Sequence, residues 1–251
     1  MKGRTTLRIG LQLYSVRDEA EKDLPGVLEA VARMGYQGVE FAGYFGHNLA
    51  DLRRQLEGLG LAAIGTHTRF ADLAQDVARV IQEHHTLGAA YCTVPYYKAP
   101  SVDQWRQFAR DLNTWGRQLK DAGVWLSYHN HHFEFEPLED TTPYTILRQI
   151  CDPTLVGLQL DVAWAHKAGQ DPAALIESLG AQSPIIHLKD VSPVGADVDI
   201  GEGLVDMQAV LKAAGRSAVM WGIVERDSAP PPTLESAHTN LKRLRALEVF
   251  P

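Results

Sequence analysis

One pattern repeats along this 251-residue chain: a segment with helical periodicity ends at or near a glycine, and a short apolar run follows within a few residues. Glycine at that position accommodates the left-handed backbone with which many helices end. The helix-like segments span residues 27–34, 49–59, 70–87, 102–122, 142–151, 172–179, 204–214 and 234–247. The apolar runs, read as strands, span residues 7–13, 38–41, 61–64, 90–94, 124–128, 155–160, 184–188 and 218–224.

Eight strands alternating with eight helices favour a closed (β/α)8 barrel over an open doubly wound sheet. The strands are apolar on both faces, which is typical of parallel strands covered by helices. GLQLYS stands where a dinucleotide-binding fold would carry GxGxxG after its first strand. The Pro-rich SAPPPT (228–233) is typical of a stiff loop rather than of a linker. We therefore expect one α/β domain over residues 1–251, folded as a single (β/α)8 barrel.

Composition narrows the classes of partner. The formal net charge is −7, which argues against a nucleic-acid or anionic-membrane partner, because phosphate binding requires clustered Lys and Arg. No apolar run approaches the length of a membrane span, and MKGRTTLRIGLQLYS lacks the apolar core of a signal peptide. Cys92 and Cys151 form no pair motif, so both are expected to remain thiols. These features predict a cytoplasmic protein and leave a homo-oligomer open.

Polar side chains gather at the carboxyl ends of the predicted strands, the rim where barrels of this class carry their active sites. Asp161, His187 and Glu225 form the sharpest set, because each ends an apolar run: LVGLQLD, PIIH and VMWGIVE. Neighbouring strands lie about 5 Å apart, so the three side chains can converge. One histidine and two carboxylates suit a divalent ion such as Mn, Co, Zn or Mg.

Each of these residues also has a structural interpretation. Asp161 can cap a following helix, His187 can be a buried core histidine, and Glu225 can pair with Arg226 or Arg8. Because all three fall on consecutive strands at one rim, we favour a shared metal site. The fourth donor must then come from YHNHHFEFE (128–136) on the preceding strand. His84 and His85, late in a helical segment, are expected to face solvent.

Several segments resemble one protein family: GLQLYSVRD (10–18), GVEFAG (38–43), YHNHHFEF (128–135), LQLDVAWAHKAGQDP (158–172), HLKD (187–190) and GEG (201–203). They are similar to the xylose-isomerase-like TIM barrels, usually labelled sugar phosphate isomerase/epimerase, and the resemblance covers essentially the whole chain. It implies one divalent metal ion held by Glu, Asp, His and Glu from the fifth to eighth strands. Asp161, His187 and Glu225 match the last three.

The fifth-strand donor departs from the family pattern. His129 stands where the family has a glutamate, and the nearest acid is Glu134, five residues on. We favour Glu134 as the fourth ligand, with His129 and His131 as the alternatives. In the epimerases of the family, that strand-five glutamate is also one of two acid/base groups.

The resemblance implies a metal-dependent isomerase or epimerase of a sugar or keto-sugar, working by proton abstraction next to a metal-bound carbonyl through an enediolate. Glu225 is expected to be the base, and Glu134, His131 or His67 the opposing acid. The residues expected to contact a small carbohydrate substrate are Tyr14, His67, Tyr97, His129, Trp164 and Lys189.

Other functions stay open on sequence grounds. The same site can act as a dehydratase or lyase on a keto-sugar, such as a 3-keto-glycoside or keto-inositol, when a leaving group lies β to the carbanion. A phosphodiesterase like endonuclease IV needs a basic DNA face, which the charge of −7 disfavours. A non-catalytic sugar-binding barrel is a further alternative. GEG at 201–203 is the one candidate phosphate loop, with little Arg or Lys around it.

Overall fold

The structure, a computed structural model, describes residues 7–247 and contains a closed parallel barrel. Neighbours around the barrel follow the order β1-β10-β7-β6-β5-β4-β3-β2, with β2 returning to β1. The strands are β1 (Arg8–Gln12), β2 (Gly38–Phe41), β3 (Ala62–His67), β4 (Tyr91–Val94), β5 (Trp125–His129), β6 (Val156–Asp161), β7 (Ile185–Leu188) and β10 (Trp221–Val224). The predicted (β/α)8 barrel is confirmed, and all eight predicted strands are present.

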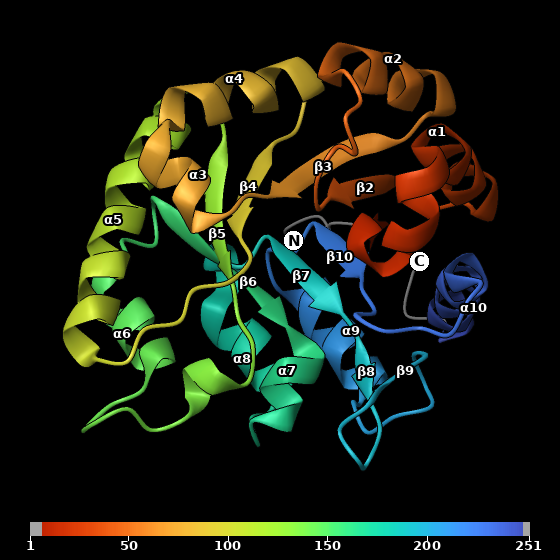
Figure 1. Cartoon of the computed structure of the whole chain (residues 1–251). Helices are drawn as coiled ribbons and strands as arrows, with labels where there is room; N and C mark the ends of the chain where they lie inside the picture. The colour runs from red at the N-terminus through yellow and green to blue at the C-terminus, as the bar shows by residue number, and fades with distance from the viewer. Residues whose placement is uncertain (1–6, 248–251) are drawn as a thin grey trace.

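Helices surround the barrel and fill all eight predicted positions (Figure 1). They are α1 (Arg17–Met34), α2 (Leu49–Leu59), α3 (Phe70–Gln75) with α4 (Val77–Leu87), α5 (Val102–Asp121), α6 (Pro143–Ile150), α7 (Val162–Lys167) with α8 (Pro172–Leu179), α9 (Met207–Arg216) and α10 (Thr233–Ala246). The glycine signal is confirmed where α2 and α4 end, since Gly60 and Gly88 have φ of 69° and 78°. None of these helices is long and apolar enough to cross a membrane.

Three local features differ from the predicted boundaries. Helix α1 begins ten residues early, because the polar segment before Pro25 is also helical, with a kink at Asp23. The helix predicted over 70–87 breaks at Asp76, whose extended backbone ends α3 and whose carboxylate caps α4 through the amide of Arg79. An antiparallel pair, β8 (Asp190–Val191) with β9 (Asp197–Val198), follows β7 and is too short to show a periodicity.

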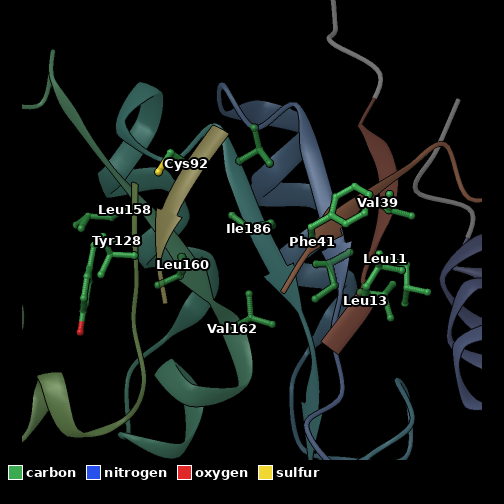
Figure 2. Packing of buried hydrophobic residues seen from close by; sticks show 14 of the residues in the cluster. Leu11, Leu13, Val39, Phe41, Cys92, Tyr128, Leu158, Leu160, Val162 and Ile186 are labelled. Carbon is green, nitrogen blue, oxygen red and sulfur yellow. The ribbon is translucent and has the colours of Figure 1, made fainter. Parts of the chain in front are cut away.

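Alternate strand residues face opposite sides of the barrel wall. One set packs with the helices in the main core, and Figure 2 shows Leu11, Val39, Cys92, Tyr128 and Ile186 from it. A separate small cluster holds strand residues alone and fills the barrel interior: Ile64, Tyr91, Ile185, Trp221 and Ile223. Continuing this alternation to the carboxyl ends places polar side chains inside the barrel mouth, above the apolar plug.

His84 differs from its expected place at the surface. It is 1% exposed, its Nδ1 donates to the Val80 carbonyl at 2.8 Å, and its Nε2 lies 3.0 Å from the Thr66 hydroxyl. His85, one position along α4, is exposed as expected. The sequence interpretation was wrong for His84 because the apolar face of the short helix α4 extends to its last turn.

Candidate metal centre and active site

Four side chains converge at the carboxyl end of the barrel: His129, Asp161, His187 and Glu225. They come from the ends of β5, β6, β7 and β10, all four are buried, and one ligand atom from each lies within 4.8 Å of the others. Register explains the convergence, because β6 pairs Asp161 with His187 and β10 pairs Ile223 with His187, which puts Glu225 at the next inward position. Asp161, His187 and Glu225, the three residues chosen from the sequence, are thus brought together.

Two atoms of this cluster have no hydrogen-bond partner although they are buried. Nε2 of His129 and Oδ2 of Asp161 face each other across 3.5 Å, and the same Nε2 is 3.9 Å from Oε2 of Glu225. An unpaired buried polar atom costs about 1–3 kcal/mol. Two such atoms aimed at one point, beside a second carboxylate, are what a cation would satisfy, and the donor set suits a borderline divalent ion.

His129 has the protonation state of a ligand. Burial lowers the pKa of its imidazole to about 4, so the ring is neutral at pH 7. Its Nδ1 lies 3.4 Å from the carbonyl oxygen of Pro95, the partner that a protonated Nδ1 takes. That arrangement leaves the Nε2 lone pair directed at the cluster, as in metal-binding histidines whose other nitrogen is held by an oxygen.

Asp161 caps a helix with one carboxylate oxygen and faces the cluster with the other. Oδ1 accepts a hydrogen bond of 2.8 Å from the amide of Trp164 and caps α7, while Oδ2 faces His129. The amide of Asp161 donates to Oδ1 of Asn130 at 3.1 Å, which fixes the backbone at the end of β6. The capping bond therefore orients the carboxylate and leaves its second oxygen available.

His187 lies between two carboxylates. Nε2 is 2.7 Å from Oε2 of Glu40, and Nδ1 is 2.9 Å from Oε2 of Glu225. Burial alone would lower the pKa of His187, but the charges of Glu225 and Glu40 raise it well above the usual value. Burial would likewise raise the pKa of Glu225, yet His187 and Lys189 hold it well below its ordinary range. Without a cation, a proton on Nδ1 therefore links the two.

Glu40, at the end of β2, is the least expected part of the site. It is fully buried and accepts hydrogen bonds of 2.7 Å from Gln12 on β1 and from Gln159 on β6, in addition to His187. A carboxylate behind a metal-binding histidine fixes the ring orientation and its tautomer. The sequence gives Glu40, within GVEFAG, no role of its own, since only the folded register shows which histidine it contacts.

Glu40, His67 and His187 also lie within reach of one ion. Oε2 of Glu40 already accepts from Gln12 and His187, and Nε2 of His67 is 3.3 Å from it. With its lone pairs committed to these donors, Glu40 is better described as an acceptor that orders the histidines than as a ligand of a second ion.

Glu134 does not belong to the four-residue cluster. Its buried carboxylate accepts from the hydroxyl of Tyr128 at 2.6 Å and from the amide of His131 at 2.7 Å. These bonds close the turn η2 (Phe133–Phe135) after β5 and turn the carboxylate away from the barrel mouth. The structure therefore places Glu134, the favoured fifth-strand donor, outside the cluster, and the β5 side chain within it is His129, one of the two alternatives left open by the sequence.

A pocket of about 530 Å³ opens over the cluster. Its lining residues are Tyr14, Ala42, His67, Arg69, Pro95, Tyr96, His129, His131, Glu225 and Asp227. We call it the reaction pocket. Tyr14 and Tyr96 are 42% and 51% exposed there, and such aromatic rings at a pocket mouth suit the C–H faces of sugars. Tyr14, His67, His129 and His131 are therefore placed where substrate contact is expected.

Three residues predicted to touch the substrate lie outside this lining. Tyr97 turns into the core and stacks on Phe108 with ring centroids 3.9 Å apart, so its neighbour Tyr96 takes the pocket position. Trp164 lies under the ammonium groups of Lys167 and Lys189, each 4.8 Å from the indole centre. Adjacent tyrosines in the loop after β4 carry no signal that says which one turns inward.

Lys189 is 1% exposed and supports the carboxylates instead of reaching into the pocket. Its ammonium forms an ion pair with Asp227 and lies 3.9 Å from Glu225 and 3.7 Å from Asp197. Burial would lower its pKa, but Glu225 and the other carboxylates raise it, so Lys189 stays charged. Glu225 is consequently held by Lys189 and His187, whereas Arg226 pairs with Asp199 and Arg8 stacks on Trp221.

The GEG segment is not available for a phosphate. The buried carboxylate of Asp190 accepts hydrogen bonds from the amides of Val191, Gly201, Gly203 and Val205 at 2.8–3.0 Å. A side chain at Gly203 would meet Oδ1 of Asp190 at 2.2 Å, which explains the glycine. The HLKD and GEG motifs therefore cooperate in tying down the loop after β7.

Comparison with known proteins finds relatives of this chain by sequence and by structure. The chain is 24% identical over 218 residues to the inosose dehydratase of Bacillus anthracis, covering 78% of this chain and 72% of that protein. A sugar phosphate isomerase/epimerase from Parabacteroides distasonis superposes with a TM-score of 0.86 at 22% identity, covering 100% and 98% of the two chains. The IOLI protein, whose crystal structure holds a zinc atom, has a TM-score of 0.75 at 17% identity, with coverage of 96% and 98%.

A family model matches residues 28–247, nearly the full length of the chain, and it describes the same barrel that the strands form. The chain therefore belongs to the xylose isomerase-like TIM barrel family.

Proposed function

We propose that this protein is a metal-dependent enzyme that removes a proton from the carbon beside the carbonyl of a sugar or keto-sugar. The observation that carries the proposal is the buried cluster of His129, Asp161, His187 and Glu225, two of whose inward-facing atoms lack a partner. A solved protein of the same fold holds a zinc atom, which is compatible with a metal ion in this barrel. A divalent ion held there would supply Lewis-acid polarisation of a carbonyl oxygen.

Glu225 is the base that the pocket favours. It lines the reaction pocket, and its low pKa keeps it ionised at neutral pH. His187 and Lys189 hold the carboxylate in place, so it can accept a carbon-bound proton without first reorienting. His67 and His131 line the same pocket and can return or relay that proton.

Among the fates of the resulting carbanion, elimination is the best supported, ahead of the isomerase and epimerase activities that the sequence favoured. Epimerisation by two bases needs a second acid/base group, and in the family epimerases that is the strand-five carboxylate. Here β5 places the neutral imidazole of His129 in the cluster, and Glu134 is bound to Tyr128. The matched relative in Bacillus anthracis is an inosose dehydratase, which also favours elimination.

The elimination requires only one base. Glu225 takes the proton beside the carbonyl, the C–H electrons form a double bond to the next carbon, and the C–O bond there breaks. The departing oxygen leaves as water or an alcohol after taking a proton. Asp227 is paired with the charged Lys189, so His67 and His131, which line the same pocket, are the candidate donors for that step. A single-base isomerisation between adjacent carbons is the second fate that this arrangement permits.

The test is solvent deuterium exchange. The metal-loaded protein is incubated in D2O with ketoses, 3-keto-glycosides and keto-inositols, and NMR follows both the C–H beside the carbonyl and the products. We expect exchange and an unsaturated product with at least one of these classes. Glu225→Gln should slow exchange by about 10²–10⁴-fold, while Glu57→Gln, at an exposed site on α2, should leave it unchanged.

Metal content is measured in the same samples, because Glu225 is also a member of the cluster. A metal-loaded Glu225→Gln protein that exchanges deuterium at the wild-type rate would show that Glu225 is not the base. Exchange that persists after complete chelation of the metal would show that the reaction does not require a metal ion.

A further inference from the structure

We infer that the substrate is a neutral glycoside with two hydroxylated units, of which the second lies in a side pocket beside the reaction pocket. The inference deepens the proposed function and rests on it. It begins from a second hollow of about 480 Å³ that shares three lining residues with the reaction pocket: Ala42, His67 and Arg69. A molecule seated over Glu225 can therefore extend across the end of β3 into this space.

The combined volume exceeds what one sugar ring requires. Ligand pockets for small molecules run from about 300 to 1,000 Å³, and each of these two hollows, at about 530 and 480 Å³, falls within that range alone. Only the reaction pocket borders His129 and Glu225 of the metal cluster. The side pocket is thus a place for binding and not for the bond that breaks.

The lining of the side pocket is rich in donors and acceptors. Thr68 supplies a hydroxyl just after β3, and Tyr44 adds a phenol from the loop after β2. The wall is completed by Arg69 just before α3, Asp72 on α3, and Arg79 and Glu83 on α4. Groups that donate next to groups that accept match sugar hydroxyls, which do both.

Charge decides between a phosphate and a neutral unit. The side pocket carries two cations and two anions, and they pair: Arg69 with Asp72, Arg79 with Glu83 and Asp72. The formal sum is zero, so no cation is left over for a phosphate. The amides of Gly201 and Gly203, the other candidate anion site, are occupied by Asp190. A neutral hydroxylated unit is what remains compatible.

The experiment compares three probes with the metal-loaded, full-length protein: 3-keto-trehalose, 3-keto-glucose and 3-keto-glucose 6-phosphate. We expect kcat/KM for deuterium exchange at C2 to be at least about tenfold higher for the two-ring probe than for 3-keto-glucose, the worth of one or two hydrogen bonds. The phosphate should bring no gain. Calorimetric affinities for the same probes provide a readout that does not need turnover.

Thr68→Phe fills the side pocket without altering the lining of the reaction pocket. It should bring the two-ring to one-ring ratio close to one. Thr114→Phe, at an exposed position on α5, is the matched control and should preserve the ratio. If circular dichroism shows that Thr68→Phe is misfolded, Glu83→Trp at the edge of the same pocket replaces it.

Equal rates and affinities for one and two rings, a preference for the phosphate, or a ratio unchanged by Thr68→Phe would overturn the inference and leave the proposed function standing. If no probe shows deuterium exchange although metal is bound, the proposed proton abstraction beside the carbonyl is refuted instead. The affinity ratio would still decide the question of the second unit.

Discussion

Glu40→Gln is the sharpest perturbation of the site, because it changes one buried atom and leaves every cluster member in place. The carboxylate accepts from Gln159 through Oε1 and from Gln12 and His187 through Oε2. An amide has one acceptor oxygen, so in either orientation at least one of these buried donors faces an NH2 group.

Two magnitudes follow from that geometry. Loss of the acceptor behind a metal-binding histidine typically costs 10–100-fold in metal affinity, about 1.4–2.7 kcal/mol. A buried donor left unpaired costs about 1–3 kcal/mol of folding stability. We therefore expect weaker metal binding and a lower free energy of unfolding together.

Metal affinity is measured by competition with a chelating dye, and stability by guanidinium unfolding in EDTA. Glu57→Gln, exposed on α2, is the control. In a His187→Ala background, Glu40→Gln should add little further loss of affinity, because the ring that it orients is gone. A metal affinity within twofold of wild type, with stability reduced, would show that Glu40 supports the fold without orienting His187.

Three further predictions follow from named contacts. Glu134→Gln should leave metal affinity within about twofold of wild type, because its carboxylate binds Tyr128 and His131; a tenfold loss in dye competition would return Glu134 to the ligand set. Metal binding at pH 7 should release about one proton from His187, whose pKa is raised by Glu225 and Glu40; calorimetry in buffers of different ionisation enthalpy should show it, and no release would contradict the protonated state. Burial lowers the pKa of His84, so the unfolded chain binds its proton more readily below pH about 6.5. Stability of the metal-free protein should accordingly fall more steeply with acid in wild type than in His84→Gln, by up to about 1.4 kcal/mol per pH unit, and equal slopes in urea titrations would refute this.

The barrel was accessible from sequence because helix-like segments and apolar runs alternate along the chain, with a glycine at six of the junctions from helix to strand. Asp161, His187 and Glu225 were accessible for the same reason, since each is the first polar residue after such a run. Register then brings them together without further information, as the pairing of Asp161 with His187 shows.

Other parts of the site depend on turns and long-range contacts that periodicity does not encode. Glu134 and His129 differ by five positions, and only the turn η2 decides which one faces the cluster. Glu40 contacts His187 across 147 positions of sequence. Asp227 follows Glu225 by two residues, and its pocket position depends on Lys189, which draws it inward.

The central claim is that one cation is held by His129, Asp161, His187 and Glu225. Anomalous diffraction from crystals soaked separately in manganese and in zinc tests it directly. The account predicts a single strong peak at the barrel mouth, bonded to Nε2 of His129, Oδ2 of Asp161, Nδ1 of His187 and Oε2 of Glu225. A peak bonded to Glu134 in place of His129, or an empty mouth with the four side chains hydrogen-bonded to one another, would contradict it.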